Sequence, residues 1–301
     1  MKTFHIGICV YPSPIWLARS FLTLTDCVEC RPELPDAEIL AKFDEFKPDF
    51  VFMQIQSADI VSTETIRTMS ETAKVINWTG DVRQPIPEWY YEVAPYVTTC
   101  FSNQTDVNVF KRLNFKCEYL QIGIDPMIFN RWENTAGCDV VFMANHYGAM
   151  FPLSKFRKQS GVILKQAFGR QANVLGSGWG ANADGNLNGN QLAESQFYSG
   201  SKIGINISHY DLDRYTSDRL FRIMGSGCMC LSHRYKGIEK DFKIGEHLDV
   251  FNDYSDMKRK VRHYLDNEAE RKRIADNGYN LVQSKFTTDN MVKEIIKIYE
   301  L

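Results

Sequence analysis

The chain has 301 residues, of which 44% are apolar and 24% are charged, proportions typical of a globular protein long enough for two domains. Its formal net charge of −2 excludes a global basic field for nucleic acid, although it leaves room for a local basic groove. No apolar run reaches membrane-spanning length, and residues 1–4 lead into a strand rather than a signal peptide. We therefore expect a cytoplasmic protein without a membrane span.

The first part of the chain alternates between apolar strand-like runs and helical patterns. Strands are predicted over residues 4–10, 50–55, 75–78, 97–101 and 118–122. Helices are predicted over residues 39–46 and 106–113, and Asn103 is the candidate N-cap of the second. Strands that alternate with helices predict a mostly parallel sheet covered on both faces.

Around residues 125–137 the alternation breaks into a mixture of Pro, Asn, Arg, Trp, Glu and Gly that is typical of a linker. The alternation then resumes, with strands over 139–143, 172–175, 203–207 and 228–231, helices over 153–168, 257–265 and 290–299, and a Gly/Asn-rich loop over 176–190. We therefore predict two Rossmann-like domains, over residues 1–125 and 138–285. The last helical stretch, 286–301, is expected to pack back on the first domain.

The eight cysteines do not predict a disulfide framework in a chain of this length. Most of them lie in apolar, strand-like segments, which favours reduced and buried thiols. Cys27 and Cys30 form a single C-x-x-C pair, and no second pair follows at a spacing typical of zinc sites. We expect neither a metal site nor a redox site there.

The segment from residue 203 to residue 231 carries the most informative pattern of the chain. An apolar strand leads into a polar loop, then into a helix that stops at Gly225 and Gly227, and then into a second apolar strand. This order of elements is a βαβ unit, and its loop lies at the carboxyl end of a strand, where open α/β sheets bind ligands. The free N–H groups and the positive dipole end at the helix N-terminus suit a phosphate group.

Polar side chains surround this loop and the start of its helix. The helix is expected to begin at Ser217 or Asp218, and Arg219 on its first turn could make a bidentate contact with a phosphate. In the alternative interpretation, Ser217 or Asp218 only caps the helix and Arg219 is a surface charge.

Several segments together resemble the C-terminal domain of GT-B glycosyltransferases, closest to the glycosyltransferase group 1 set with the CgeB-like proteins. The resembling segments, in chain order, are VVFMANHYG (140–148), NVLGSGW (173–179), YSGSKIGINIS (198–208) and SDRLFRIMGSG (217–227). The segment GIDPMIF (123–129) resembles the connection between the two domains of that family. The resemblance implies an α/β GT-B fold, in which two Rossmann-like domains with parallel sheets face each other across a cleft.

The resemblance also implies a function. It predicts a metal-independent hexosyl- or pentosyltransferase without cofactors, which moves a sugar from a nucleotide-diphosphate sugar to an acceptor hydroxyl. The donor would bind to the second domain and the acceptor mainly to the first. The acceptor could be a polysaccharide, a protein, a small molecule or modified DNA, and neither the oligomeric state nor the choice between inversion and retention is predicted.

One departure from the family pattern keeps other functions open. Many members carry Glu one position after the Phe of the donor-site helix, and this chain has Arg222 there. The alternatives are a nucleotide-sugar epimerase or hydrolase, since fold does not fix function, or a non-catalytic nucleotide-sugar-binding protein, which Arg222 favours.

Candidate donor-binding residues follow from position and from this resemblance. They are Asn145, Tyr147, His209, Asp211, Asp213, Ser217, Asp218 and Arg219. Asp211 and Asp213 form a short Asp-x-Asp pattern that could hold a divalent metal, but we favour hydrogen bonds to sugar hydroxyls and predict no metal. Lys155 and Arg157 are expected on a solvated helix face.

Acceptor-side candidates come from the first domain. Asp81 follows a predicted strand and Gly80, so its carboxylate would lie at the carboxyl edge of the sheet, where it could act as a general base. A turn aspartate is the alternative interpretation. Tyr11 and residues 12–16 follow the first predicted strand and are acceptor-site candidates by position alone.

Overall fold

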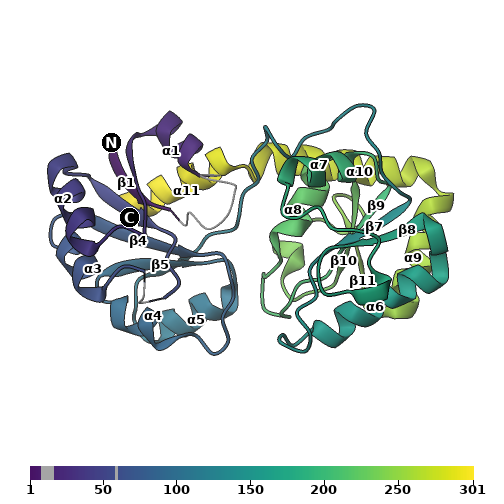
Figure 1. Cartoon of the computed structure of the whole chain (residues 1–301), viewed down its shortest axis with the longest axis horizontal. Helices are drawn as coiled ribbons and strands as arrows, with labels where there is room; N and C mark the ends of the chain where they lie inside the picture. The colour runs from purple at the N-terminus through teal and green to yellow at the C-terminus, as the bar shows by residue number, and fades with distance from the viewer. Residues whose placement is uncertain (8–16, 58–59) are drawn as a thin grey trace. The chain divides into compact units, whose positions relative to one another are not determined.

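The computed structural model describes residues 1–7, 17–57 and 60–301 (Figure 1). The acceptor candidates Tyr11 and 12–16 lie outside the described residues. The chain divides into two compact units. The N-terminal unit comprises Met1–Gly123 together with Thr288–Leu301, and the C-terminal unit comprises Ile124–Thr287. No helix in the described segments is both long enough and apolar enough to cross a membrane.

The N-terminal unit is built on a six-stranded parallel sheet of order β2-β1-β3-β4-β5-β6. Its strands are β1 (Lys2–Ile6), β2 (Asp26–Cys30), β3 (Phe50–Met53), β4 (Lys74–Thr79), β5 (Val97–Phe101) and β6 (Cys117–Tyr119). Its helices are α1 (Ala18–Leu24), α2 (Asp36–Phe46), α3 (Thr63–Ser70), α4 (Glu88–Val93), α5 (Gln104–Arg112) and α11 (Thr288–Glu300). The side chain of Asn103 accepts a hydrogen bond from the Asp106 amide and caps α5, as predicted.

Two apolar layers cover the two faces of this sheet because side chains alternate along each strand. On β3, Val51 and Met53 join the core cluster that includes α2 and α3, whereas Phe50 and Phe52 join the cluster that includes α1 and α11. All four β3 side chains are completely buried, which explains the continuous apolar run. The last helix of the chain thus completes the core of the first unit.

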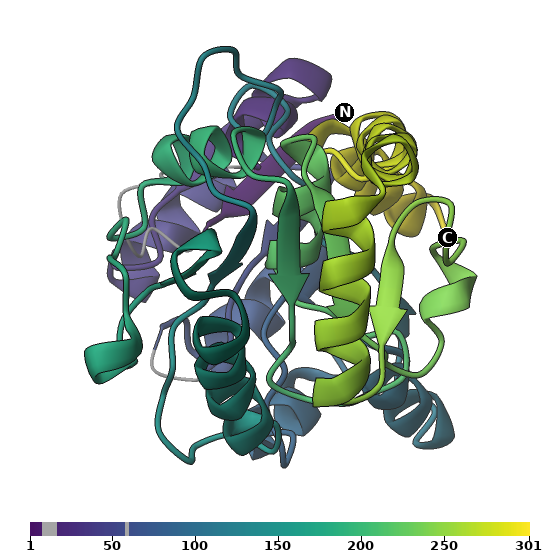
Figure 2. The same cartoon turned by 90° about the vertical axis from the view of Figure 1, so that its right-hand side faces the viewer.

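The C-terminal unit has a five-stranded parallel sheet of order β11-β10-β9-β7-β8. Its strands are β7 (Val140–Met143), β8 (Ala172–Leu175), β9 (Ile203–Asn206), β10 (Met229–His233) and β11 (Asp249–Phe251). Its helices are α6 (Ser154–Phe168), α7 (Gln191–Ser199), α8 (Asp218–Gly225), α9 (Tyr254–Asp266) and α10 (Glu268–Lys285), with short turns η1 (Gly169–Gln171), η2 (Gly180–Asn182) and η3 (Ile238–Lys240). Figure 2, in which this unit faces the viewer, shows helices packed around the strands.

The strand order of the C-terminal unit reverses between β7 and β9. The chain leaves β7 toward β8 on one side, whereas it leaves β9 toward β10 on the other side. The loops that follow these two adjacent strands therefore diverge and leave a crevice outside their carboxyl ends. Such a switch point is the place where open α/β sheets bind their ligands.

A close approach between β9 and α8 fixes the wall of this crevice. A Cβ at Gly204 would lie 2.7 Å from Cγ2 of Ile223, a separation that side chains do not tolerate. The glycine in the β9 sequence IGIN therefore lets α8 pack directly on the strand. This contact sets the position of the α8 N-terminus at the carboxyl edge.

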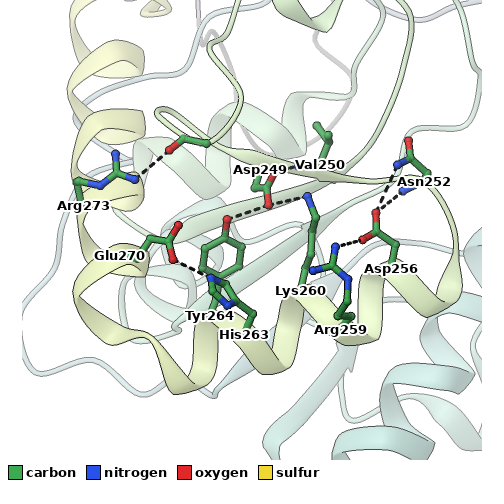
Figure 3. A network of polar contacts seen from close by, with 11 residues as sticks. Asp249, Val250, Asn252, Asp256, Arg259, Lys260, His263, Tyr264, Glu270 and Arg273 are labelled. Atoms are coloured by element: carbon green, nitrogen blue, oxygen red, sulfur yellow. Dashed lines mark hydrogen bonds and ion pairs between the residues drawn. The ribbon is translucent and has the colours of Figure 1, made fainter.

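A polar network ties the edge strand β11 of the same sheet to α9 and α10 (Figure 3). The buried carboxylate of Asp249, the first residue of β11, accepts hydrogen bonds from Lys260 Nζ and Tyr264 OH, each at 2.8 Å. Burial, and then the Asp249 carboxylate, raise the pKa of the Tyr264 hydroxyl. His263 and Glu270 join α9 to α10 at 2.7 Å. This network stabilises the fold away from the switch point.

Candidate functional site

The switch-point site consists of the loop after β7 (residues 144–153), the loop after β9 (207–217) and the first turn of α8. Arg219 on that first turn reaches across the ends of both strands. Its Nε donates to the Met143 carbonyl at 2.6 Å, and its Nη1 donates to the Ile207 carbonyl at 3.2 Å and to Ser217 Oγ at 3.1 Å. Among the described residues, no carboxylate forms an ion pair with this guanidinium.

A second arginine, Arg157 of α6, lies in the same place. Its side chain is 1% exposed and donates to the carbonyls of Ile207 and Asn145, the latter at 2.9 Å. Burial, and then the Arg219 charge, lower the pKa of the Arg157 guanidinium, although an arginine remains charged at neutral pH. No ion-pair partner for Arg157 occurs within the described ranges.

The expectation that Arg157 lies on a solvated helix face is wrong, whereas its neighbour Lys155 is exposed as expected. The buried positions of α6 are Ser154, Arg157, Ser160, Gly161, Leu164 and Phe168. Position 157 belongs to this 3–4 periodicity, and that spacing is the sequence signal that could have placed the arginine inside.

Two guanidinium groups that form no ion pair within the described ranges place two positive charges at the centre of the switch-point site. They repel each other, and the first N–H groups of α8 add the positive end of a helix dipole. Isolated buried charges of one sign are costly, so a bound anion would relieve this repulsion. The arrangement can hold an anion that carries two or more negative charges.

Ser217 is the N-cap residue of α8 by position, but its side chain makes no cap hydrogen bond. Its hydroxyl donates to Asn206 Oδ1 at 3.1 Å and accepts from Arg219. Asp218 instead forms an ion pair with Arg222 at 2.6 Å. Ser217 is thus the N-cap residue of α8, as expected, but its hydroxyl contacts Arg219 instead of a backbone N–H group of the helix.

Asn145 and Tyr147 lie in the loop after β7, and both are exposed. Asn145 Oδ1 accepts from the Ser177 amide at 2.9 Å, and its Nδ2 donates to the Tyr147 hydroxyl at 3.2 Å. These bonds attach the loop after β7 to the loop after β8. The Tyr147 ring is therefore held at the rim of the switch-point site.

His209 packs into an aromatic group beside the arginines. Its ring centroid lies 4.2 Å from that of Phe151 and 5.6 Å from that of Tyr147. Burial, and then the charges of Arg157 and Arg219, lower the pKa of His209 to about 3. Its Nδ1 is buried and has no hydrogen-bond partner in the described part of the chain. The imidazole is therefore neutral at physiological pH.

Asp211 and Asp213 differ in their surroundings. Asp211 is exposed, whereas the Asp213 side chain is only 12% exposed and forms ion pairs with Lys236 at 3.2 Å and Lys240 at 3.9 Å. Lysines from the segment after β10 thus engage Asp213. Within the described ranges, no three His, Cys, Asp or Glu side chains converge on a possible metal position.

Asp81 belongs to the other unit. It follows β4, its side chain is exposed, and its carbonyl accepts from the Thr79 hydroxyl at 2.9 Å. The preceding carbonyl, that of Gly80, accepts from Ser102 at 3.0 Å. These bonds hold the turn at the carboxyl edge of the N-terminal sheet and leave the Asp81 carboxylate in solvent.

The pattern of a known family covers much of the C-terminal unit, including α6 from Arg157 onward. Residues 157–297 match the glycosyl transferase-like family. The match includes Arg157, Arg219 and the whole of α8, whereas the loop after β7 (residues 144–153) precedes the matched residues. No curated protein matches the chain.

Solved glycosyltransferase structures share the fold along nearly the whole chain. A glycosyltransferase from Rickettsia africae superposes with a TM-score of 0.67 at 9% identity, covering 99% of this chain and 97% of that one. HepE from Anabaena, crystallised with UDP and glucose, gives 0.68 at 12% identity, with 99% and 98% covered. Sucrose-phosphate synthase from Thermosynechococcus elongatus gives 0.69 at 9% identity, with 100% and 98% covered. The predicted α/β fold with two parallel sheets, like that of GT-B glycosyltransferases, is confirmed.

Proposed function

We propose that the protein is a glycosyltransferase that takes a sugar from a nucleotide-diphosphate sugar and passes it to an acceptor hydroxyl. The observation that carries the proposal is the pair of uncompensated arginines, Arg157 and Arg219, at the switch point of the C-terminal unit. The glycosyl transferase-like match over the same residues supports this choice.

The diphosphate of the donor supplies the charge that this site lacks. As the sugar leaves, negative charge grows on the diphosphate, and two fixed guanidinium groups with the α8 N-terminus stabilise it. Two arginines neutralise a diphosphate without a metal ion, so we propose a metal-independent reaction. HepE, which shares the fold, has been crystallised with UDP-glucose, and UDP-sugars are therefore the first donors to test.

The neighbouring residues would handle the rest of the donor. Tyr147 and Asn145 at the rim offer a ring face and an amide to the uncharged parts of the molecule. The neutral imidazole of His209 can exchange hydrogen bonds with hydroxyl groups but does not add a charge. We propose that Asp211, which is exposed beside them, accepts hydrogen bonds from sugar hydroxyls.

We propose that the N-terminal unit binds the acceptor and that Asp81 takes its proton. The Asp81 carboxylate is exposed at the carboxyl edge of that sheet, on a turn that Thr79 and Ser102 brace. A general base so placed would accept the proton as the acceptor oxygen attacks the anomeric carbon. The seven cysteines among the described residues are free thiols, and most are buried, which supports a reducing compartment such as the cytoplasm.

The decisive experiment measures release of UDP from UDP-glucose with and without a panel of hydroxyl acceptors. Acceptor-dependent release establishes transfer, whereas release without any acceptor identifies a hydrolase. Binding without turnover identifies a binding protein. Arg219→Met is expected to weaken UDP binding about 10-fold or more, because a charged hydrogen bond to phosphate is lost. Arg170→Met, which removes an exposed arginine of η1, is the matched control, and equal effects of both changes would contradict the proposed site.

A further inference from the structure

Arg222 on the second turn of α8 stands at the centre of a charge cluster next to the switch-point site. Its Nη1 pairs with Glu194 Oε2 at 2.8 Å, and its Nη2 pairs with Asp218 Oδ2 at 2.6 Å. The Arg222 side chain is 24% exposed and the Glu194 side chain 12% exposed. The arginine is therefore shared by two carboxylates that come from two different helices.

The two carboxylates reach Arg222 from two adjacent helices. Asp218 lies where α8 begins, at the carboxyl edge of the sheet, whereas the first turn of α7 packs beside the end of α8, where Ser195 Oγ lies 3.0 Å from Ser226 Oγ. Glu194 is in the first turn of α7, and Asp218 is the first residue of α8, directly before Arg219. The Arg219 charge also acts on Glu194. The cluster thus adjoins the arginine pair instead of forming a separate surface patch.

A second observation concerns a buried hydroxyl on which the charges of this cluster act. The hydroxyl of Tyr198, one turn after Glu194 on α7, is completely buried and has no hydrogen-bond partner among the described residues. The groups that act on it electrostatically include Glu194, Arg219 and Arg222. A buried hydroxyl without a partner is costly, and it marks a place where a polar group is missing.

We propose that Glu194 and Asp218, held by Arg222, form a subsite that accepts hydrogen bonds from vicinal hydroxyls of the nucleotide-sugar donor. Each carboxylate gives one oxygen to Arg222 and keeps the other as an acceptor. The chemistry is that of a diol, which both the ribose and the transferred sugar provide. This inference rests on the proposed function, since it places the uncharged part of the donor beside its diphosphate.

Arg222 has a clear role in this subsite. Two carboxylates next to a diphosphate would repel it, and a shared arginine removes most of that repulsion. The same arginine fixes the orientation of both carboxylates, so that their free oxygens are preorganised for hydroxyl donors. Many family members have Glu where this chain has Arg222. A sugar-binding role does not require that Glu here, because Glu194 of α7 supplies a carboxylate instead.

The test compares three probes by calorimetry: inorganic pyrophosphate, UDP and UDP-glucose. Glu194→Gln and Asp218→Asn keep the shape of each side chain and remove its charge. Each is expected to weaken UDP or UDP-glucose binding about 10-fold, because a charge-assisted hydrogen bond is lost, and to change pyrophosphate binding less than about 2-fold. A loss of affinity for both UDP and UDP-glucose assigns the subsite to the ribose, which both molecules contain. A loss of affinity for UDP-glucose alone assigns it to the transferred sugar.

Two further variants separate a diol subsite from a purely structural cluster. Arg222→Glu gathers three carboxylates and is expected to abolish binding of all three probes. The reversed pair, Glu194→Arg with Arg222→Glu, restores the ion pair and is expected to recover pyrophosphate binding to within about 3-fold of the parent. Glu268→Gln, on the exposed face of α10, is the control for charge removal.

The outcomes distinguish the two proposals. Equal losses for pyrophosphate and UDP in Glu194→Gln would mean that Glu194 only supports Arg219, and the diol subsite would be rejected. No loss with any probe would reject it as well, as would a folded reversed pair that binds no better than Arg222→Glu. A parent protein that binds neither pyrophosphate nor UDP would instead overturn the proposed function itself, and the subsite with it.

Discussion

Arg157 and Arg219 donate hydrogen bonds to the same acceptor, the carbonyl oxygen of Ile207 at the end of β9. One arginine comes from α6 and the other from α8, and each also binds a carbonyl near the end of β7, those of Asn145 and Met143 respectively. The two guanidinium groups therefore lock together the two strands at which the sheet reverses its order. These hydrogen bonds hold the two guanidinium groups in fixed positions, which preorganises them for an anion.

Removal of the buried Arg157 charge should weaken binding strongly but change stability little. We expect Arg157→Met to weaken pyrophosphate binding about 10-fold or more, since one of two guanidinium charges is lost. Its free energy of unfolding should change by less than about 1.5 kcal/mol, because the buried charge is replaced by an apolar side chain of similar length. Calorimetric titration and urea unfolding measure the two quantities. A large loss of stability with unchanged binding would contradict the assignment.

The stability of the C-terminal unit should depend on His209 in acid. Its folded pKa of about 3 lies below the usual value of 6.5, so the unfolded chain binds the proton more readily. Stability is then fully present above about pH 6.5 and falls as the pH drops toward 3. Burial also lowers the pKa values of His146, His233 and His247, so the informative quantity is the difference between variants.

We expect His209→Gln to lose less stability than the parent between pH 7 and pH 4.5, as measured by urea unfolding at each pH. The control Gln166→Ala alters an exposed side chain of α6 that does not titrate and should follow the parent curve. Parallel curves for His209→Gln and the parent would show that the imidazole is not buried in its neutral form.

The network around Asp249 on the edge strand β11 should contribute to stability without a role in binding. Lys260→Met leaves the buried Asp249 carboxylate with Tyr264 as its remaining side-chain donor, and we expect the free energy of unfolding to fall by roughly 2–4 kcal/mol. Pyrophosphate affinity below the unfolding transition should stay within about 2-fold, because β10 separates β11, which carries the network, from the strands β9 and β7 of the switch point. The matched change Lys272→Met breaks an exposed pair with Glu268 and should cost less than about 0.5 kcal/mol.

The contact between β9 and α8 can be tested by a double-mutant cycle. Gly204→Ala introduces a methyl group 2.7 Å from the Ile223 side chain, and we expect a loss of about 1–3 kcal/mol from overpacking. In the background of Ile223→Ala the same change should cost much less, since the clashing atoms are gone. Equal costs in both backgrounds would refute a steric role for Gly204.

Kinetic measurements can distinguish a role of Asp81 in catalysis from a role in donor binding. Asp81→Asn should lower kcat about 100-fold or more if the carboxylate takes the acceptor proton, because general-base catalysis typically contributes at least that much. Binding of UDP should be unchanged, since the arginines that hold the diphosphate belong to the other unit. Unchanged turnover would leave Asp81 as a turn residue only. Asp49→Asn at the opposite edge of the same unit is the control.

Much of the fold follows from sequence periodicity. The runs around β3, β7 and β9 are continuously apolar because these strands are buried on both faces, and such runs are visible without a structure. The edge strand β2, with the sequence DCVEC, was missed because it is half-exposed and polar. The long helix α10 was also missed, since its buried positions include Arg271 and Gly278 among many charged residues.

The sequence by itself determined the α/β class, the βαβ unit around α8 and the phosphate-compatible helix start, because these depend on local patterns of apolar, polar and glycine residues. Only the tertiary structure decided which charged side chains of the site are buried and which of them form ion pairs. It buried Arg157 beside Arg219, engaged Asp213 with two lysines, and joined Arg222 to Glu194. These pairs connect residues 23 to 62 positions apart along the chain, so their partners depend on the strand order and the helix packing rather than on any local pattern.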